Sequence, residues 1–156
     1  MLLFAVIGLG FLATILDPTR TGAGNGNVIT VESPSGIDLV LLWIGVGMVL
    51  LGIIIRFVAI ATLKKNFSGR LRIREDHTLI KNGIYHWVRH PAYLGLILVF
   101  LGIPVIGSSV LGFLVMLLVV PLLLHRIRLE EVMLIERFGA EYEEYRNHSK
   151  KLIPFL

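Results

Sequence analysis

The chain has 156 residues, 55% of them hydrophobic, and a mean hydropathy of +0.80. This composition excludes an ordinary soluble domain and favours an integral membrane protein, while the length allows one small domain. The net charge of +4 does not indicate nucleic-acid binding, because the basic residues flank apolar segments. Cysteine is absent, which excludes disulfides, thiolate zinc sites and thiol nucleophiles.

The first half of the chain contains two apolar segments. Residues 1–16 have no basic residue before them and no small-residue cleavage site after them, so we predict a short, retained membrane helix rather than a signal peptide. Residues 37–63 exceed the about 20 residues that a membrane crossing needs. The glycine- and asparagine-rich stretch between them, residues 17–36, is typical of a loop.

Two further apolar segments, residues 91–106 and 110–124, are separated only by residues 107–109. This short connection predicts a tight helical hairpin. Pro104 and Pro121 are expected to bend their helices, because proline removes one backbone hydrogen bond. The second of these helices is expected to continue into a polar helical tail that ends near Gly139, followed by a short turn.

Basic residues are distributed unevenly between the loops. Loop 17–36 carries only Arg20, whereas loop 64–90 and the tail after residue 125 carry the remainder outside the apolar segments: Lys64, Lys65, Arg70, Arg72, Arg74, Lys81, Arg89, Arg126, Arg128, Arg137, Arg146, Lys150 and Lys151. By the positive-inside rule, the loop and the tail face the cytoplasm, and two more crossings place the N-terminus there as well.

These patterns together predict the fold class. We expect an all-α, multi-pass integral membrane protein of about four transmembrane helices, in which a cytoplasmic loop and the helical tail cap a cytoplasmic site. Residues 1–63 form the N-terminal membrane helices with an external loop, and residues 64–156 form the functional core of one structural domain.

Arg89, His90, Pro91 and Tyr93 lie where a polar loop meets the third apolar segment. Pro91 suits the first position of a helix and makes His90 the expected cap. A helix start attracts anions, Arg89 adds a positive charge, and the Tyr93 ring is able to face a bound cation. The alternative is that Arg89 and His90 reach lipid headgroups and that Tyr93 belongs to an aromatic belt.

Arg126, Glu130 and Glu131 lie at the far end of the hairpin. Arg126 and Glu130 share a helix face, while Glu131 points about 100 degrees away. Glu130 has the chemistry to accept hydrogen bonds from hydroxyls or an amine, and Arg126 is able to hold a carboxylate in a bidentate grip. The alternative is an exposed ion pair of little energetic value. We predict that this cluster and the one at residues 89–93 meet in space and form one site.

Two further polar features have simpler interpretations. His86 and His90 have the i, i+4 spacing of metal ligands, but Pro91 interrupts a helix there, so we predict no metal site. Arg56 lies inside the second apolar segment, where a charge is costly. We expect it either to reach the membrane surface or to pair with a carboxylate.

Two ordered blocks of residues resemble the isoprenylcysteine carboxyl methyltransferase family, which is related to the membrane phospholipid methyltransferases. The resemblance extends from about residue 66 to the end of the chain. Its residues are His77-Thr78-Leu79-Ile80, Gly83-Ile84-Tyr85, Arg89-His90-Pro91, Tyr93 and Gly95, then Arg126, Glu130-Glu131, Leu134, Phe138-Gly139, Glu141-Tyr142, Tyr145 and Ile153-Pro154.

The resemblance implies an S-adenosylmethionine-dependent methyltransferase, most simply one that O-methylates the carboxyl group of a prenylcysteine-like lipidated acceptor entering from the bilayer. It implies Arg126 as the residue that faces the acceptor carboxylate. The cofactor contacts that it implies are His77, Thr78, Leu79, Ile80, Tyr85, Arg89, His90, Pro91, Ala92, Tyr93 and Glu130.

The acceptor decides which catalytic groups the reaction needs. A carboxylate acceptor is ionised at neutral pH, so Arg126 would orient it and no general base is required. An amine acceptor would have to lose a proton, and Glu131 is the best candidate to take it. A phospholipid amine or a small thiol therefore stays open as the acceptor.

A non-enzymatic alternative is a small four-helix membrane transporter. Its motivation is the small size and the intramembrane Arg56. Such a protein would need an ionisable carboxylate at mid-membrane. The acidic residues of this chain lie near segment ends or in loops, which disfavours the transporter.

Overall fold

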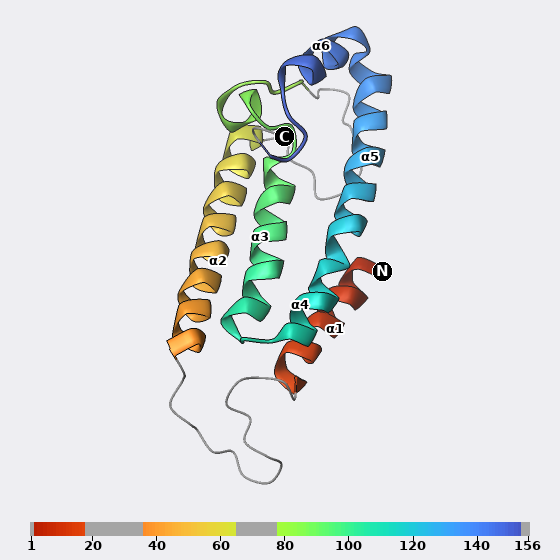
Figure 1. Ribbon diagram of the computed structural model, residues 1–156. Coiled ribbons are helices and arrows are strands. Elements are labelled where there is room, and N and C mark those ends of the chain that lie inside the picture. Colours follow the sequence, from red (N-terminus) through yellow and green to blue (C-terminus); the bar gives the residue numbers. More distant parts are fainter. Residues whose placement is uncertain (1, 18–35, 65–77, 154–156) are drawn as a thin grey trace. The chain divides into compact units, whose positions relative to one another are not determined.

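The computed structural model describes residues 2–17, 36–64 and 78–153. Within these ranges every regular element is a helix, and the exception to helical structure is one isolated parallel bridge between Val88 and Lys150. The helices are α1 (Leu2–Leu16), α2 (Gly36–Leu63), the 3-10 helix η2 (Gly83–His86), α3 (Pro91–Ile106), α4 (Val110–Leu117), α5 (Val119–Phe138) and α6 (Ala140–His148), coloured along the chain in Figure 1. The predicted all-helical fold class is confirmed.

Two helical segments are long and apolar enough to cross a membrane. They are α2, with 28 residues, and the segment Val110–Phe138, with 29 residues, in which α4 and α5 follow each other. Exposed apolar side chains cover α2: Trp43 and Phe57 expose 71% and 72% of their surface. A core helix of a soluble protein would bury such side chains. Helices α1 and α3 are apolar but shorter, so the expected four crossings stay a prediction.

The connection between α3 and α4 is as short as predicted. Helix α3 ends at Ile106 and α4 begins at Val110, after the cap residue Ser109. The Ser109 hydroxyl accepts a hydrogen bond from the Gly112 N–H at 2.9 Å, which satisfies one of the free donors at a helix start. The interruption between α4 and α5 falls at Leu118, three residues before Pro121. Proline at 121 offers no N–H to the carbonyl four residues earlier and crowds it, which accounts for a break here.

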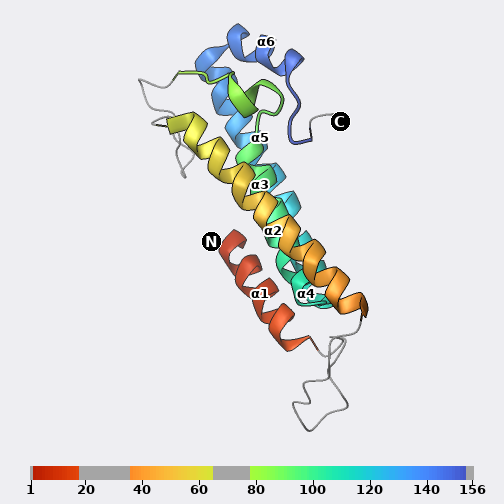
Figure 2. The same cartoon turned by 90° about the vertical axis from the view of Figure 1, so that its left-hand side faces the viewer.

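The contacts divide the chain into two compact units. The first consists of residues 1–52 and 97–122. In it, α1 lies beside α4 (Figure 2). Asp17, directly after α1, accepts hydrogen bonds from the Ser109 hydroxyl at 2.6 Å and the Leu111 N–H at 2.9 Å. A buried carboxylate therefore ties the end of α1 to the start of α4, where the helix dipole also favours a negative charge.

The close packing of α2 against α3 in this unit depends on two glycines. A Cβ atom on Gly45 would lie 2.6 Å from the Ile106 nitrogen and 2.8 Å from the Gly102 carbonyl oxygen. Small residues let apolar helices approach at backbone distance in a membrane. Gly45 and Gly102 therefore set how closely the two helices pack.

The second unit consists of residues 53–96 and 123–156. Its apolar cluster contains Ala59, Tyr85 and Ala92, with Leu63, Ile80 and Ile84 packed against them. Helix α6 begins after Gly139, whose φ of 51° is readily adopted by glycine. The acidic first turn and basic last turn of α6 complement its dipole, so this polar helix is expected to be stable where Figure 1 shows it, at the end of α5.

We predict that Gly45→Ala destabilises the chain, whereas the matched substitution Gly47→Ala does not. Overpacking typically costs about 1–3 kcal/mol, and a Cβ on Gly47 would meet no atom within 4 Å. Alanine at 47 instead gains helix propensity. Thermal unfolding of both variants in detergent measures the difference, and equal unfolding temperatures would contradict the assigned close approach.

Candidate functional site

The start of α3 is built as the sequence predicts. Pro91 is the first helical residue, and the His90 carbonyl accepts hydrogen bonds from the N–H groups of Tyr93 at 3.1 Å and Leu94 at 3.2 Å. Pro91 is fully buried and His90 is 4% exposed. The helix start is therefore held inside the second unit.

Tyr93 joins the two predicted clusters. Its hydroxyl donates a hydrogen bond to Oε2 of Glu130 at 2.8 Å and accepts one from Nε of Arg126 at 3.1 Å. Arg126 and Glu130 lie one turn apart on α5, so one phenol reaches both. The predicted meeting of the two clusters in space is confirmed.

The Glu131 carboxylate lies against three basic side chains. Its Oε1 lies 3.1 Å from Nε of Arg89 and 3.4 Å from Nε2 of His90, and its Oε2 lies 3.0 Å from Nζ of Lys151. Glu131 is 7% exposed. A buried carboxylate is stable only when it is paired in this way.

The chain end completes this arrangement. Residues 149–151 run beside the segment before α3: the Arg89 N–H donates to the Lys150 carbonyl at 2.8 Å, and the His90 N–H donates to that of Lys151 at 3.1 Å. The Arg89 guanidinium also donates to the backbone carbonyls of Ser149 and Arg146. Arg89 therefore connects α3, α5 and the residues after α6.

Helix α6 is anchored by a tyrosine. The Tyr145 hydroxyl donates to the Tyr85 carbonyl at 2.6 Å, and the Ser149 hydroxyl donates to the Tyr145 carbonyl at 2.5 Å. Burial raises the pKa of Tyr145 to about 12, so its hydroxyl remains a donor throughout the physiological range.

Arg56 has a partner that neither predicted alternative named. Its Nη1 donates to the backbone carbonyl of Ala92 at 3.1 Å, in the first turn of α3. A guanidinium that lies on the α2 segment of this unit therefore helps to hold the start of α3.

The residues expected as cofactor contacts have different surroundings. Six of them lie at the start of α3. Arg89 and His90 directly precede the helix, Pro91, Ala92 and Tyr93 are its first residues, and Glu130 accepts a hydrogen bond from the Tyr93 hydroxyl. Thr78 is exposed, Leu79 is half-buried, and Ile80 packs against the apolar cluster. Tyr85 is 6% exposed within that cluster. His77 lies outside the described residues.

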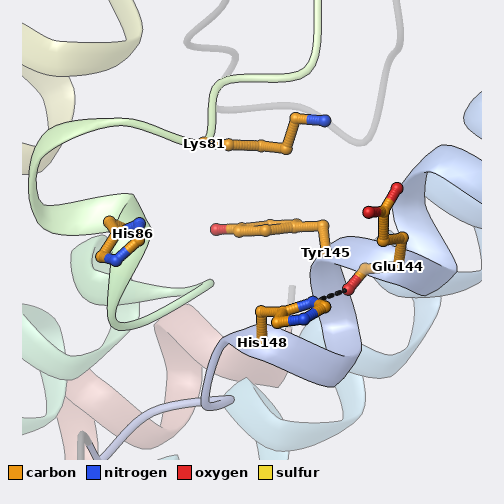
Figure 3. Close-up of a pocket in the computed structure, with 5 residues that line it drawn as sticks. All are labelled: Lys81, His86, Glu144, Tyr145 and His148. Atoms are coloured by element: carbon orange, nitrogen blue, oxygen red, sulfur yellow. Dashed lines mark hydrogen bonds between the residues drawn. The ribbon is translucent and has the colours of Figure 1, made fainter.

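A separate shallow pocket of about 180 Å³ lies on this unit (Figure 3). Its lining residues are Lys81, His86, Glu144, Tyr145 and His148. None of them is a predicted site residue, and the pocket is smaller than the roughly 300 Å³ at which ligand sites usually begin. Among the described residues, no group of three or more histidines and carboxylates is placed to hold a metal ion.

Sequence reasoning did not identify Lys151, Ser149 and Arg146 as partners of the site. Lys151 was considered only as a basic residue that indicates membrane topology, although it pairs with Glu131. Ser149 and Arg146 contact Arg89 mainly through their backbone carbonyls. Backbone acceptors leave no trace in side-chain chemistry. One feature of the sequence does indicate that α6 packs against the rest of this unit. Tyr142 and Tyr145 have an i, i+3 spacing, which places both rings on one face of the helix.

The sequence of this chain is similar to those of known proteins. The family model described as "Isoprenylcysteine carboxyl methyltransferase (ICMT) family" matches residues 44–136. The protein-S-isoprenylcysteine O-methyltransferase of Saccharomyces cerevisiae is 37% identical over 116 residues, which are 72% of this chain and 48% of the yeast protein. That of Rattus norvegicus is 33% identical over 115 residues, 72% of this chain and 40% of the rat protein.

The fold is also found in a solved structure, titled as the eukaryotic intramembrane Ras methyltransferase ICMT. It aligns with a TM-score of 0.75 at 24% identity, covering 97% of this chain and 52% of the solved one. The chain thus spans about half the length of these relatives. With more than half of its residues matched by the family model, the chain belongs to the isoprenylcysteine carboxyl methyltransferase family.

Proposed function

We propose that this chain is an S-adenosylmethionine-dependent membrane methyltransferase that O-methylates the carboxyl group of a prenylcysteine-like lipidated acceptor. The observation that carries the proposal is the Tyr93 phenol, which links Arg126 to Glu130 beside the start of α3. Family membership supports the reaction class.

The donor set beside α3 fits the methyl donor. The donor's carboxylate suits Arg89 and the start of α3, its hydroxyls suit the Glu130 carboxylate, and its sulfonium suits the Tyr93 ring. When bound, S-adenosylmethionine supplies a methyl group activated on sulfur. The proposed contacts are His77, Thr78, Leu79, Ile80, Tyr85, Arg89, His90, Pro91, Ala92, Tyr93 and Glu130.

Tyr93 orients both of its partners. Its hydrogen bond holds the Glu130 carboxylate in one rotamer, and its acceptor lone pair holds Nε of Arg126. Arg126 then presents its guanidinium to the acceptor carboxylate, which is already ionised and needs no base. Methyl transfer of this kind depends mainly on positioning, which a fixed hydrogen-bonded chain provides.

Glu131 acts in this proposal as a positioning residue. Arg89, His90 and Lys151 engage both of its oxygens, so it is poorly disposed to accept a proton from substrate. A carboxylate acceptor requires no such proton transfer. The engaged Glu131 carboxylate therefore favours a carboxyl acceptor, which needs no base, over a phospholipid amine or a small thiol.

The proposed topology has four crossings, with both termini and the site on the cytoplasmic side. The exposed apolar side chains of α2 support contact with lipid, and the basic residues near the site support its cytoplasmic orientation. The acceptor's lipid tail would then enter from the bilayer, while the methyl donor enters from water.

The full chain in lipid nanodiscs, supplied with methyl-labelled S-adenosylmethionine and N-acetyl-S-farnesylcysteine, tests the proposal. We expect label in the farnesylcysteine product, and mild alkali should release it as methanol because a methyl ester hydrolyses. Label that resists alkali, or that enters only the nanodisc phospholipids, would refute carboxyl methylation.

We predict that Glu130→Ala and Arg126→Ala have separable effects. A lost hydrogen bond to a charged group costs about 1.5–3 kcal/mol, so Glu130→Ala should raise the Kd for S-adenosylhomocysteine about 10- to 100-fold. Arg126→Ala should leave this Kd within about threefold and raise the KM for the acceptor about tenfold or more. Calorimetry and initial rates measure the two constants, and an equal loss of cofactor affinity in both variants would contradict the division of roles.

A further inference from the structure

Arg56 places a charge inside an apolar helix. Helix α2 carries two charged residues, Asp38 in its first turn and Arg56 in its second half. The neighbouring Phe57 exposes 72% of its surface, as expected of a side chain that faces lipid. A charged side chain within a membrane segment is costly and usually has a functional reason. Arg56 therefore calls for an explanation beyond membrane topology.

The guanidinium of Arg56 contacts another helix. Its Nη1 donates to the Ala92 carbonyl at 3.1 Å, the one hydrogen bond that its side chain makes to a described residue. No carboxylate among the described residues forms an ion pair with it. A cation is also unfavourable beside a helix start, where the dipole is positive. Helix stability alone therefore does not explain a cation at this position.

The carbonyl that Arg56 binds belongs to the turn that carries Tyr93. Ala92 directly precedes Tyr93 and is 8% exposed. Its carbonyl and the Tyr93 nitrogen share one planar peptide group. A hydrogen bond to that carbonyl therefore fixes the peptide from which the Tyr93 side chain extends. The Tyr93 hydroxyl in turn donates to Glu130 at 2.8 Å and accepts from Arg126 at 3.1 Å.

The segment before α3 is held by a different set of bonds. The Arg89 N–H donates to the Lys150 carbonyl at 2.8 Å, and the His90 N–H donates to the Lys151 carbonyl at 3.1 Å. These backbone bonds to the chain end stop at His90. Arg56 adds, from α2, a constraint on the turn that follows.

We propose that Arg56 is a positioning residue of the methyl-transfer site, acting through the Ala92–Tyr93 peptide on the Tyr93 hydroxyl. This inference rests on the proposed function. A charge-assisted hydrogen bond is stronger than a neutral one, so a guanidinium holds this peptide more firmly than an uncharged amide would. The phenol then stays between Arg126 and Glu130, and these two groups keep the placement that an in-line transfer requires.

A double-mutant cycle in the full chain tests whether Arg56 acts through the Tyr93 hydroxyl. Arg56→Met should lower kcat for N-acetyl-S-farnesylcysteine about tenfold or more, because a charge-assisted hydrogen bond is lost. In the Tyr93→Phe background the same substitution should lower kcat less than about threefold, since the hydroxyl that Arg56 positions is already absent. Equal factors in both backgrounds would overturn the inference, because independent effects are additive in free energy.

Calorimetric binding of S-adenosylhomocysteine repeats the cycle without turnover. Arg56→Met should raise the Kd about threefold or more, because Glu130 is a proposed ligand contact that the Tyr93 hydroxyl orients. In the Tyr93→Phe background the same substitution should leave the Kd unchanged. An equal rise in Kd in both backgrounds would count against the inference in the same way.

Thermal unfolding separates positioning from a merely structural role. Arg56→Met removes a hydrogen bond but also a charge that is costly in an apolar helix, so we expect an unfolding temperature within a few degrees of wild type. Arg56→Lys keeps a cation that donates, and it should recover part of kcat. The matched control Phe57→Leu should leave both quantities unchanged. A fall in unfolding temperature that parallels the loss of kcat in both Arg56 variants would overturn the inference.

The outcomes separate the two proposals. If wild type neither binds S-adenosylhomocysteine nor methylates N-acetyl-S-farnesylcysteine, the proposed function fails. If wild type does both and Arg56→Met retains wild-type kcat and Kd, the proposed function stands and the role of Arg56 is refuted.

Discussion

The candidate site depends on one buried carboxylate. The Glu131 carboxylate contacts Arg89 and His90, which directly precede α3, and Lys151, which follows α6. Two charges removed from water are expensive unless each is fully paired, so these groups constrain one another strongly. Segments that are distant in sequence are thereby held around the start of α3.

The neighbouring Glu130 lies on a different face of α5 and has a different environment. It is reached by the Tyr93 phenol, which also accepts from Arg126. Glu131 thus has a structural role and Glu130 a proposed chemical role, because the helical repeat points the two adjacent side chains about 100 degrees apart. Arg56, bound to the Ala92 carbonyl, adds a further constraint on the same helix start.

Much of this arrangement is readable from the sequence, because it is encoded locally. Pro91 predicts where α3 begins, and the three residues 107–109 predict the hairpin. The role of Lys151 could not be predicted, because an ion pair between the chain end and α5 depends on the tertiary path of residues 149–151. Likewise, nothing in the sequence distinguishes Tyr142 from Tyr145; the difference is whether a backbone carbonyl lies within reach.

The central claim is that Glu131 positions the site whereas Glu130 serves the ligand. Thermal unfolding and S-adenosylhomocysteine binding of Glu131→Gln and Glu130→Gln test it most directly. Breaking a buried ion pair costs about 3–5 kcal/mol, so Glu131→Gln should lower the unfolding temperature and weaken binding together. Glu130→Gln should weaken binding and unfold near the wild-type temperature. A Glu131→Gln protein with wild-type stability and binding but no turnover would contradict the account and indicate a proton acceptor instead.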